Sequence, residues 1–85
     1  RVRDVYAVLE VADSSLWYDR GKKLEIYAES GIPEYWIVDV AKQGIQMYAQ
    51  PHGRRYGSYR LALRGASVTF AAFPDVEFAV DELLG

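Results

Sequence analysis

The sequence contains no cysteine, which excludes disulfide scaffolds and thiolate metal sites. It also contains no apolar run near the roughly 18 residues that a membrane-spanning helix needs. The N-terminal residues lack the secretory pattern of an apolar stretch followed by a small-residue cleavage site. We therefore expect a cytoplasmic protein with no membrane partner.

An excess of charge of either sign is missing as well. Ten basic and twelve acidic residues leave a net charge of −2, which argues against a chain held on nucleic acid by overall positive charge. Hydrophobic residues make up 51% of the 85 positions, so the chain is not a disordered tail. A domain of this size buries only about 60–65% of its unfolded surface. We therefore expect a second copy or further sequence to cover part of its apolar surface.

The first half of the sequence predicts a strand–helix–strand unit. Residues 5–11 are almost continuously apolar, which favours a central strand covered on both faces of a parallel sheet. Helical periodicity runs over residues 16–30, and residues 34–39 predict a second buried strand. Two strands joined in this way are parallel and have a right-handed crossover.

The second half predicts antiparallel strands. Apolar and polar residues alternate over residues 45–49 and 59–64, with a polar loop over residues 50–57 between them. A short strand over residues 67–70 follows, and Asp81 is a candidate N-cap for a final helical turn. The predicted fold class is α/β (α+β), with one βαβ unit followed by antiparallel strands in a single domain.

Glu10 is the most informative residue, because it lies near the carboxyl end of an apolar strand. Burial of an unpaired carboxylate costs several kcal/mol. Ligand sites of open α/β sheets lie just beyond the carboxyl ends of the strands. Its position alone supports equally a functional carboxylate and a structural one, which points to water at a sheet edge or pairs with a lysine.

Lys23 lies at the border of the apolar face of the predicted helix. From there its stem can be buried while its ammonium reaches the carboxyl edge of the sheet. Asp19 stands four residues before it and Tyr27 four residues after it, and helix spacing by itself favours a surface pair between Asp19 and Lys23. Asp39, at the end of the second predicted strand, is more typical of a residue that starts a turn than of a site residue.

A local basic and aromatic stretch spans residues 54–64. Arg54, Arg55 and Arg60 in this stretch are candidates for contacts with DNA phosphates. A solvated face of a hairpin is the more common role of such a stretch.

Several segments in their order and spacing resemble the Uma-type restriction endonuclease family, an outlying branch of the PD-(D/E)XK nuclease superfamily. The segments that carry this resemblance are residues 9–15 (LEVADSS), residues 18–21 (YDRG), Lys23-Leu24, Tyr27-Ala28 and residues 31–39 (GIPEYWIVD). The resemblance implies a restriction-endonuclease-like core and a metal-dependent endonuclease that hydrolyses phosphodiester bonds of DNA.

The resemblance also implies roles for individual residues. Glu10 matches the acidic residue of the (D/E)XK half-motif, and Lys23 matches a lysine that this branch carries on the following helix, since Ala12 occupies its usual position. Mg²⁺ would be held by Glu10 and the backbone carbonyl of Val11. Ser14, Asp19 and Tyr27 are further candidate neighbours of this site.

One element of the superfamily pattern is missing from the sequence. Its other metal-binding aspartate lies on an upstream strand, and Asp4 cannot replace it because six residues of the same strand put Asp4 about 20 Å from Glu10. We therefore expect residues 1–85 to be the C-terminal part of a larger domain, inactive or nearly so unless another chain or copy completes the site. The alternative is a non-catalytic structural module that forms homo-oligomers, most simply a dimer.

Overall fold

The computed structural model describes residues 6–12 and 17–85 of the chain. Six strands and two helices follow one another in these residues. In chain order they are β1 (Ala7–Ala12), α1 (Trp17–Glu29), β2 (Glu34–Asp39), β3 (Gly44–His52), β4 (Arg55–Leu63), β5 (Ser67–Val68), β6 (Phe78–Ala79) and α2 (Val80–Leu84).

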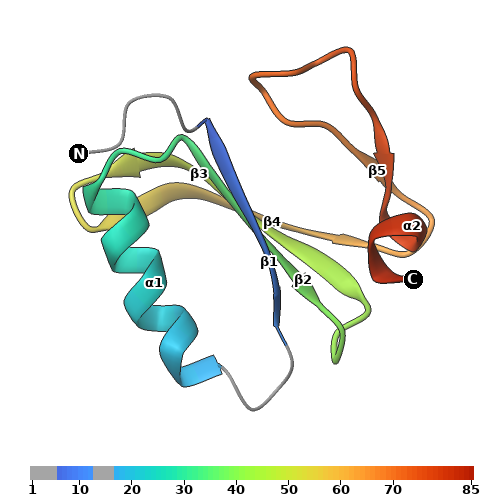
Figure 1. The fold of residues 1–85 in the computed structure, drawn as a ribbon, viewed down its shortest axis with the longest axis horizontal. Coiled ribbons are helices and arrows are strands. Elements are labelled where there is room, and N and C mark those ends of the chain that lie inside the picture. The colour runs from blue at the N-terminus through green and yellow to red at the C-terminus, as the bar shows by residue number, and fades with distance from the viewer. Residues whose placement is uncertain (1–5, 13–16) are drawn as a thin grey trace.

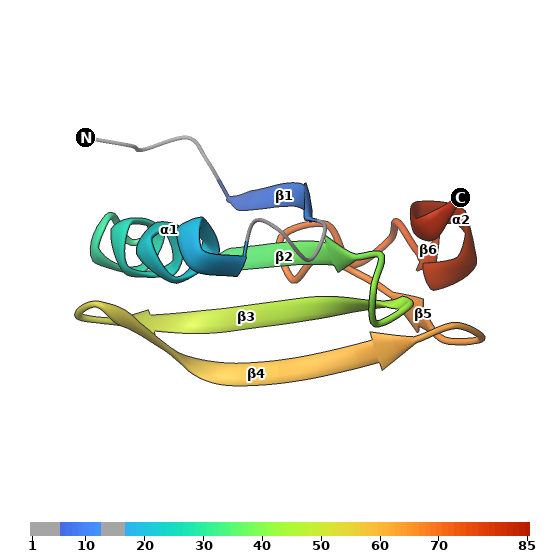
Figure 2. The ribbon, with the colours of Figure 1, turned by 90° about the horizontal axis from the view of Figure 1, so that it is seen from below.

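The first four strands form one mixed sheet in the order β1-β2-β3-β4, which Figure 2 shows with β1 at the top. β1 and β2 are parallel, and α1 connects them, as the sequence predicts for a βαβ unit. β2, β3 and β4 pair antiparallel in succession, and β5 and β6 form a second, two-stranded sheet. The predicted mixed α and β fold class is therefore confirmed.

The two faces of the sheet are covered by different parts of the chain. Figure 1 shows α1 on one side of the sheet and the C-terminal residues from β5 to α2 on the other. On the helix face, Tyr35 and Ile37 pack with Leu24 and Tyr27 of α1. On the opposite face, which we call the C-terminal face, Trp36 lies at the centre of a core completed by β5, β6 and α2. Alternate residues of β2 thus serve two separate cores.

β1 differs from its predicted role as a central strand. Within residues 6–12 and 17–85 it has β2 as its sole strand neighbour, so it forms an edge of the sheet. Leu9 is 45% exposed and Val11 is 67% exposed on the C-terminal face of this edge. A run of apolar residues indicates that both faces of a strand can be buried. It does not indicate whether the strand is central or at an edge, because that depends on which strands pair with it.

The polar loop predicted over residues 50–57 is wrong. β3 and β4 run through this stretch, and only Gly53 and Arg54 connect them. Gly53 has a φ of +63° at the first central position, as a type II′ hairpin turn requires. Pro51 is tolerated because pairing with β2 ends at Ala49, so no strand of the described residues on that side requires its missing N–H.

The strand predicted over residues 67–70 ends early, at Val68. Phe70 does not continue the strand; its ring stacks on Trp36 with the centroids 3.7 Å apart. This stacking contributes to the Trp36 core of the C-terminal face.

Asp81 is not the N-cap of the final helix, in contrast to the prediction. The N-cap of α2 is Ala79, two residues earlier, and Glu82 Oε1 accepts a hydrogen bond from the Ala79 N–H at 3.4 Å. Asp81 Oδ1 accepts one from the Gly65 N–H at 3.0 Å. The aspartate therefore ties the turn after β4 to α2. Neither helix of the described residues has the length and apolar character needed to cross a membrane.

Candidate active site

Glu10 lies on the helix face of β1 and accepts hydrogen bonds from three side chains. The Tyr35 hydroxyl donates to Oε1 at 2.9 Å, and the Tyr27 hydroxyl donates to Oε2 at 2.9 Å. Lys23 Nζ lies 3.4 Å from Oε1. The carboxylate singled out in the sequence therefore lies beside the lysine of α1, on the same side of the sheet.

The βαβ unit explains why these residues meet. Tyr35 is paired with Val8 in the parallel register, so it is the diagonal neighbour of Glu10 on the same face. Aromatic side chains can span such a diagonal. Lys23 and Tyr27 are four residues apart in α1 and therefore share the side of the helix that faces Glu10.

The surroundings of Glu10 favour its ionised form. Desolvation tends to raise its pKa, but the hydrogen bonds from Tyr35 and Tyr27 and the positive charge of Lys23 outweigh desolvation, and the net effect lowers the pKa below its usual 4.5. Burial and the bond to Glu10 raise the pKa of Tyr27. At neutral pH a carboxylate thus faces protonated hydroxyls.

The Glu10–Lys23 pair lies at the margin of the fold. The Lys23 side chain is 49% exposed and the Glu10 side chain is 26% exposed. An ion pair this open to water contributes at most about 1 kcal/mol to stability. Its ammonium and carboxylate are accessible to a ligand from solvent.

Glu10 has the chemistry of a ligand for a hard cation. Mg²⁺ prefers oxygen ligands and is often held by one or two carboxylates, with water and phosphate oxygens completing its shell. A carboxylate has about four acceptor positions, so the two tyrosines leave some unoccupied. Within residues 6–12 and 17–85, however, no three His, Asp or Glu residues gather as a metal-binding group. The described residues therefore fit part of a Mg²⁺ site, with the carbonyl of Val11 as a backbone candidate next to Glu10.

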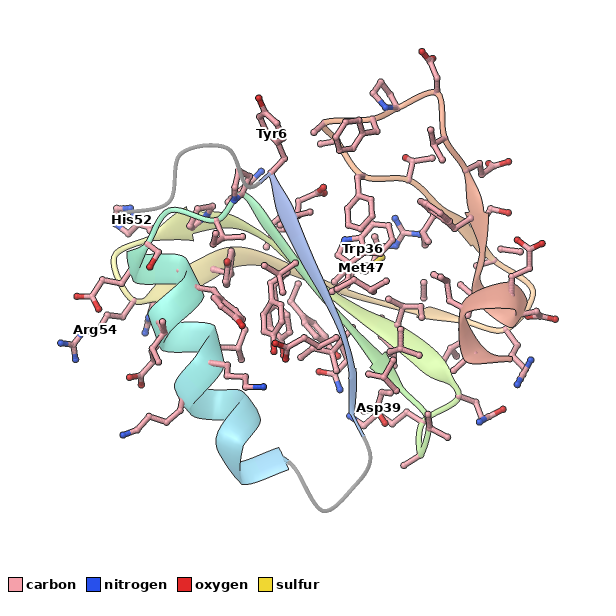
Figure 3. The ribbon with its side chains drawn as sticks, in the orientation of Figure 1. Tyr6, Trp36, Asp39, Met47, His52 and Arg54 are labelled. Atoms are coloured by element: carbon pink, nitrogen blue, oxygen red, sulfur yellow. The ribbon has the colours of Figure 1, made fainter. Side chains whose placement is uncertain are left out.

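Asp39 supports the β2–β3 turn, as its place at a strand end indicates. Its Oδ1 accepts a hydrogen bond from the Lys42 N–H at 3.1 Å, and its Oδ2 accepts one from Gln46 Nε2 at 2.6 Å. Figure 3 shows it at the end of the sheet where β2 meets this turn. These bonds give the buried carboxylate a structural role.

Ser14, Asp19 and Tyr27 are the other predicted neighbours of the site, and the structure describes the side chain of Tyr27. Tyr27 contacts Glu10, as described. Ser14 lies outside the described residues, and so does the side chain of Asp19, although its backbone belongs to α1. Tyr35 was not among the predicted site residues. The only signal for it in the sequence is the parallel pairing of β1 with β2, and the register of that pairing cannot be read from either strand.

The three candidate arginines do not gather near Glu10. Arg54 and Arg55 lie at the tip of the β3–β4 hairpin, six residues along β3 from the level of Glu10, or about 20 Å. Figure 3 shows Arg54 at the left of the view, well apart from Asp39 near its centre. Arg60 is paired with Met47 and therefore belongs to the C-terminal face, where Figure 3 shows Trp36 and Met47.

Comparison with known proteins identifies a family. The family model Uma2, described as "Putative restriction endonuclease", matches residues 1–81 of the 85. No curated protein and no solved structure matches the chain. The matched residues include β1, α1 and β2, which carry Glu10, Lys23, Tyr27 and Tyr35. The chain therefore belongs to the Uma2 family.

Proposed function

We propose that the chain belongs to a metal-dependent DNA endonuclease in which Glu10 holds the metal and Lys23 assists the attacking water. Family membership indicates a nuclease and DNA as its substrate. The observation that carries the proposal is the meeting of Glu10 and Lys23, 3.4 Å apart on the helix face of the βαβ unit. In this fold class, ligand sites lie at this end of the parallel strands.

The chemistry of phosphodiester hydrolysis explains the residue types. When bound, Mg²⁺ supplies neutralisation of phosphate charge and a more acidic water. Glu10 and the Val11 carbonyl would hold it at the end of β1. Lys23, half exposed beside Glu10, can donate a hydrogen bond to the attacking water or to a phosphate oxygen.

The hairpin arginines would bind DNA away from the scissile bond. Phosphates of one DNA strand are about 3.4 Å apart along the helix axis. A separation of about 20 Å along β3 therefore corresponds to about six phosphates. Arg54 pairs with Glu29 at 3.6 Å, but both side chains are largely exposed, so a phosphate can replace this carboxylate at low cost.

The 85-residue chain is expected to be inactive or nearly so by itself. Glu10 is the carboxylate that pairs with Lys23 among the side chains that the structure describes, whereas the superfamily pattern uses a second acidic ligand from an upstream strand. That strand would come from a preceding segment of the same domain, or its ligand from another copy.

A DNA-nicking assay in the presence of Mg²⁺ tests this function. The protein with its natural upstream sequence should nick DNA, and Glu10→Ala or Lys23→Ala should abolish the activity. Glu77→Ala, which changes an exposed glutamate of the C-terminal segment, is the control and should retain activity. Full activity of the longer Glu10→Ala protein would contradict the function. Strong, Glu10-dependent nicking by the 85-residue chain would contradict its inactivity.

A non-catalytic assembly module is the second candidate. The edge of β1, which pairs with no strand of the described residues on its outer side, favours it, because Leu9 and Val11 expose apolar side chains along that edge. An apolar cavity of about 580 Å³ lies beside it, between Ala7 and Leu9 of β1 and Phe73 and Val76 of the C-terminal segment. A module of this kind would form a homodimer that is indifferent to Mg²⁺ and to Glu10→Ala.

A further inference from the structure

Two tyrosine hydroxyls fix the Glu10 carboxylate at both of its oxygens. Tyr35 donates to Oε1 and Tyr27 donates to Oε2, each at 2.9 Å. A single hydrogen bond would let the carboxylate rotate about its terminal torsion, which is a soft one. Two bonds from different elements define the plane of the group.

The tyrosine rings are themselves held in place. Tyr35 is 1% exposed and lies between two other rings. The Tyr27 ring meets it edge-on, with centroids 4.9 Å apart, and the Tyr48 ring stacks on it at 6.1 Å. Because interiors pack closely, a ring confined in this way presents its hydroxyl from a nearly fixed point.

The hydroxyls are neutral, and this matters for a cation site. Tyrosine donors orient a carboxylate without cancelling its negative charge, whereas an ammonium in the same place repels a metal ion. Lys23 is the charged donor to Glu10: its ammonium lies at the longer distance of 3.4 Å, and its side chain is half exposed. The hydroxyls of Tyr27 and Tyr35 should therefore strengthen metal binding, whereas the charge of Lys23 should weaken it.

We propose that Tyr35, together with Tyr27, is a positioning residue that holds the Glu10 carboxylate in the orientation in which it binds a metal ion. This inference rests on the proposed role of Glu10 as a metal ligand. Neither tyrosine contacts the metal; both act through Glu10.

Mg²⁺ titration of the 85-residue chain, followed by amide NMR, tests the inference and also detects weak binding. Tyr35→Phe removes one hydroxyl and should raise the dissociation constant about 10–100-fold, the usual loss when a partner of a ligand is removed. Tyr27→Phe should act in the same direction. Lys23→Met should lower the dissociation constant, since it removes a competing charge.

Tyr56→Phe is the matched control. The Tyr56 hydroxyl belongs to the same aromatic cluster but donates to the Ile32 carbonyl at 2.8 Å. Its removal costs a hydrogen bond without touching Glu10, so the dissociation constant should stay that of the parent. Thermal unfolding of each variant verifies folding, and Tyr27→Phe carries the test if Tyr35→Phe does not fold.

The outcomes separate this inference from the function on which it rests. A parent chain that shows no Mg²⁺ binding dependent on Glu10, judged against Glu10→Gln, overturns the positioning role, whereas the proposed function is decided separately by the nicking assay on the longer protein. Parent binding that Tyr35→Phe and Tyr27→Phe leave unchanged overturns the positioning role alone. Weaker binding in Tyr56→Phe as well would show a general effect of stability and would also overturn it.

Discussion

Glu10 is a charged side chain in a strand of apolar residues, and its three donors explain how the fold accommodates it. Without them the partly buried carboxylate would lose hydration and gain nothing in exchange. Two of the donors are neutral hydroxyls and the third is an exposed ammonium. These donors thus stabilise the Glu10 carboxylate without a ligand, and the carboxylate still has acceptor positions open.

Two residues of the candidate site, Glu10 and Lys23, could be predicted from the sequence, whereas Tyr35 could not. A glutamate in an apolar strand requires a partner, and Lys23 at the border of a helix can provide one, so both could be singled out. Tyr35 could not, because an aromatic residue in a buried strand is typical of a core. Its hydroxyl becomes informative only once the register places it diagonally from Glu10.

The folded state should lose the contribution of Glu10 in acid. Its pKa is lowered in the folded chain, so the stabilisation is complete above about pH 4.5, the usual value, and is lost as the pH falls through the folded pKa. The groups that face Glu10 are Lys23 and Tyr27 from α1 and Tyr35 from β2. At pH 7 we expect Glu10→Gln to reduce the free energy of unfolding by on the order of 1 kcal/mol.

Urea unfolding at pH 7 and at pH 3 measures this difference. It should shrink at pH 3, because the carboxylate of the unfolded chain is largely protonated there and folding must release that proton. Glu77→Gln, at an exposed position, serves as the control. An equal difference between parent and Glu10→Gln at both pH values would contradict the expectation.

At the scale of elements, the sequence predicts the centre of β3 in the β3–β4 hairpin but not where this strand ends. The alternation over residues 45–49 predicts the centre of β3 correctly. Its extension to His52 was missed because Pro51, Gly53 and Gly57 are typical of loops. Pairing between β3 and β4 continues regardless, since Pro51 faces no strand on its other side and Gly53 completes a tight turn.

Gly44, at the start of β3, should not tolerate a side chain. A Cβ atom built there would lie 2.8 Å from the Ala62 carbonyl oxygen and 2.9 Å from Leu63 Cδ2 on β4. Because the oxygen belongs to the backbone, the strands must move apart. We expect Gly44→Ala to lower the free energy of unfolding by about 1–3 kcal/mol, as overpacking does. Chemical denaturation measures this, and a variant as stable as the parent would contradict the close approach of β4.

Gly21, inside α1, should respond in the opposite direction. No described atom lies within 4 Å of a Cβ built at this position, so alanine meets no obstacle there. Alanine is favoured over glycine in a helix interior by about 1 kcal/mol. We therefore expect Gly21→Ala to raise the free energy of unfolding by up to about 1 kcal/mol, measured in the same denaturation series. A loss of stability would indicate that the helix needs a glycine here for close packing.

At the scale of the whole molecule, the middle of the sheet is well covered, whereas β1 and β4 each lack a strand neighbour on one side among residues 6–12 and 17–85. Trp36, Val38 and Ile45 are almost completely buried under the C-terminal segment. The unit of β1, α1 and β2 could be predicted because its periodicities change clearly from strand to helix and back. The exposure of β1 could not, because the sequence of a strand is the same whether or not a neighbour is present.

The free edge of β1 leads to a prediction about self-association. Unpaired N–H and C=O groups beside exposed apolar side chains favour pairing with another strand, and lysine on an edge opposes it. We expect the 85-residue chain to form dimers as its concentration rises through the micromolar range. Val11→Lys should shift this equilibrium towards the monomer, because Val11 is 67% exposed on β1, more than Leu9 at 45%.

Sedimentation equilibrium at several concentrations measures the association, with Ile26→Lys as the matched control. Ile26 is also an exposed apolar residue, at 54%, but it lies on α1, away from the strand edge. The same added charge should leave the association of that variant unchanged if β1 forms the interface. A parent chain that stays monomeric, or two variants that weaken association equally, would show that chains do not pair through β1.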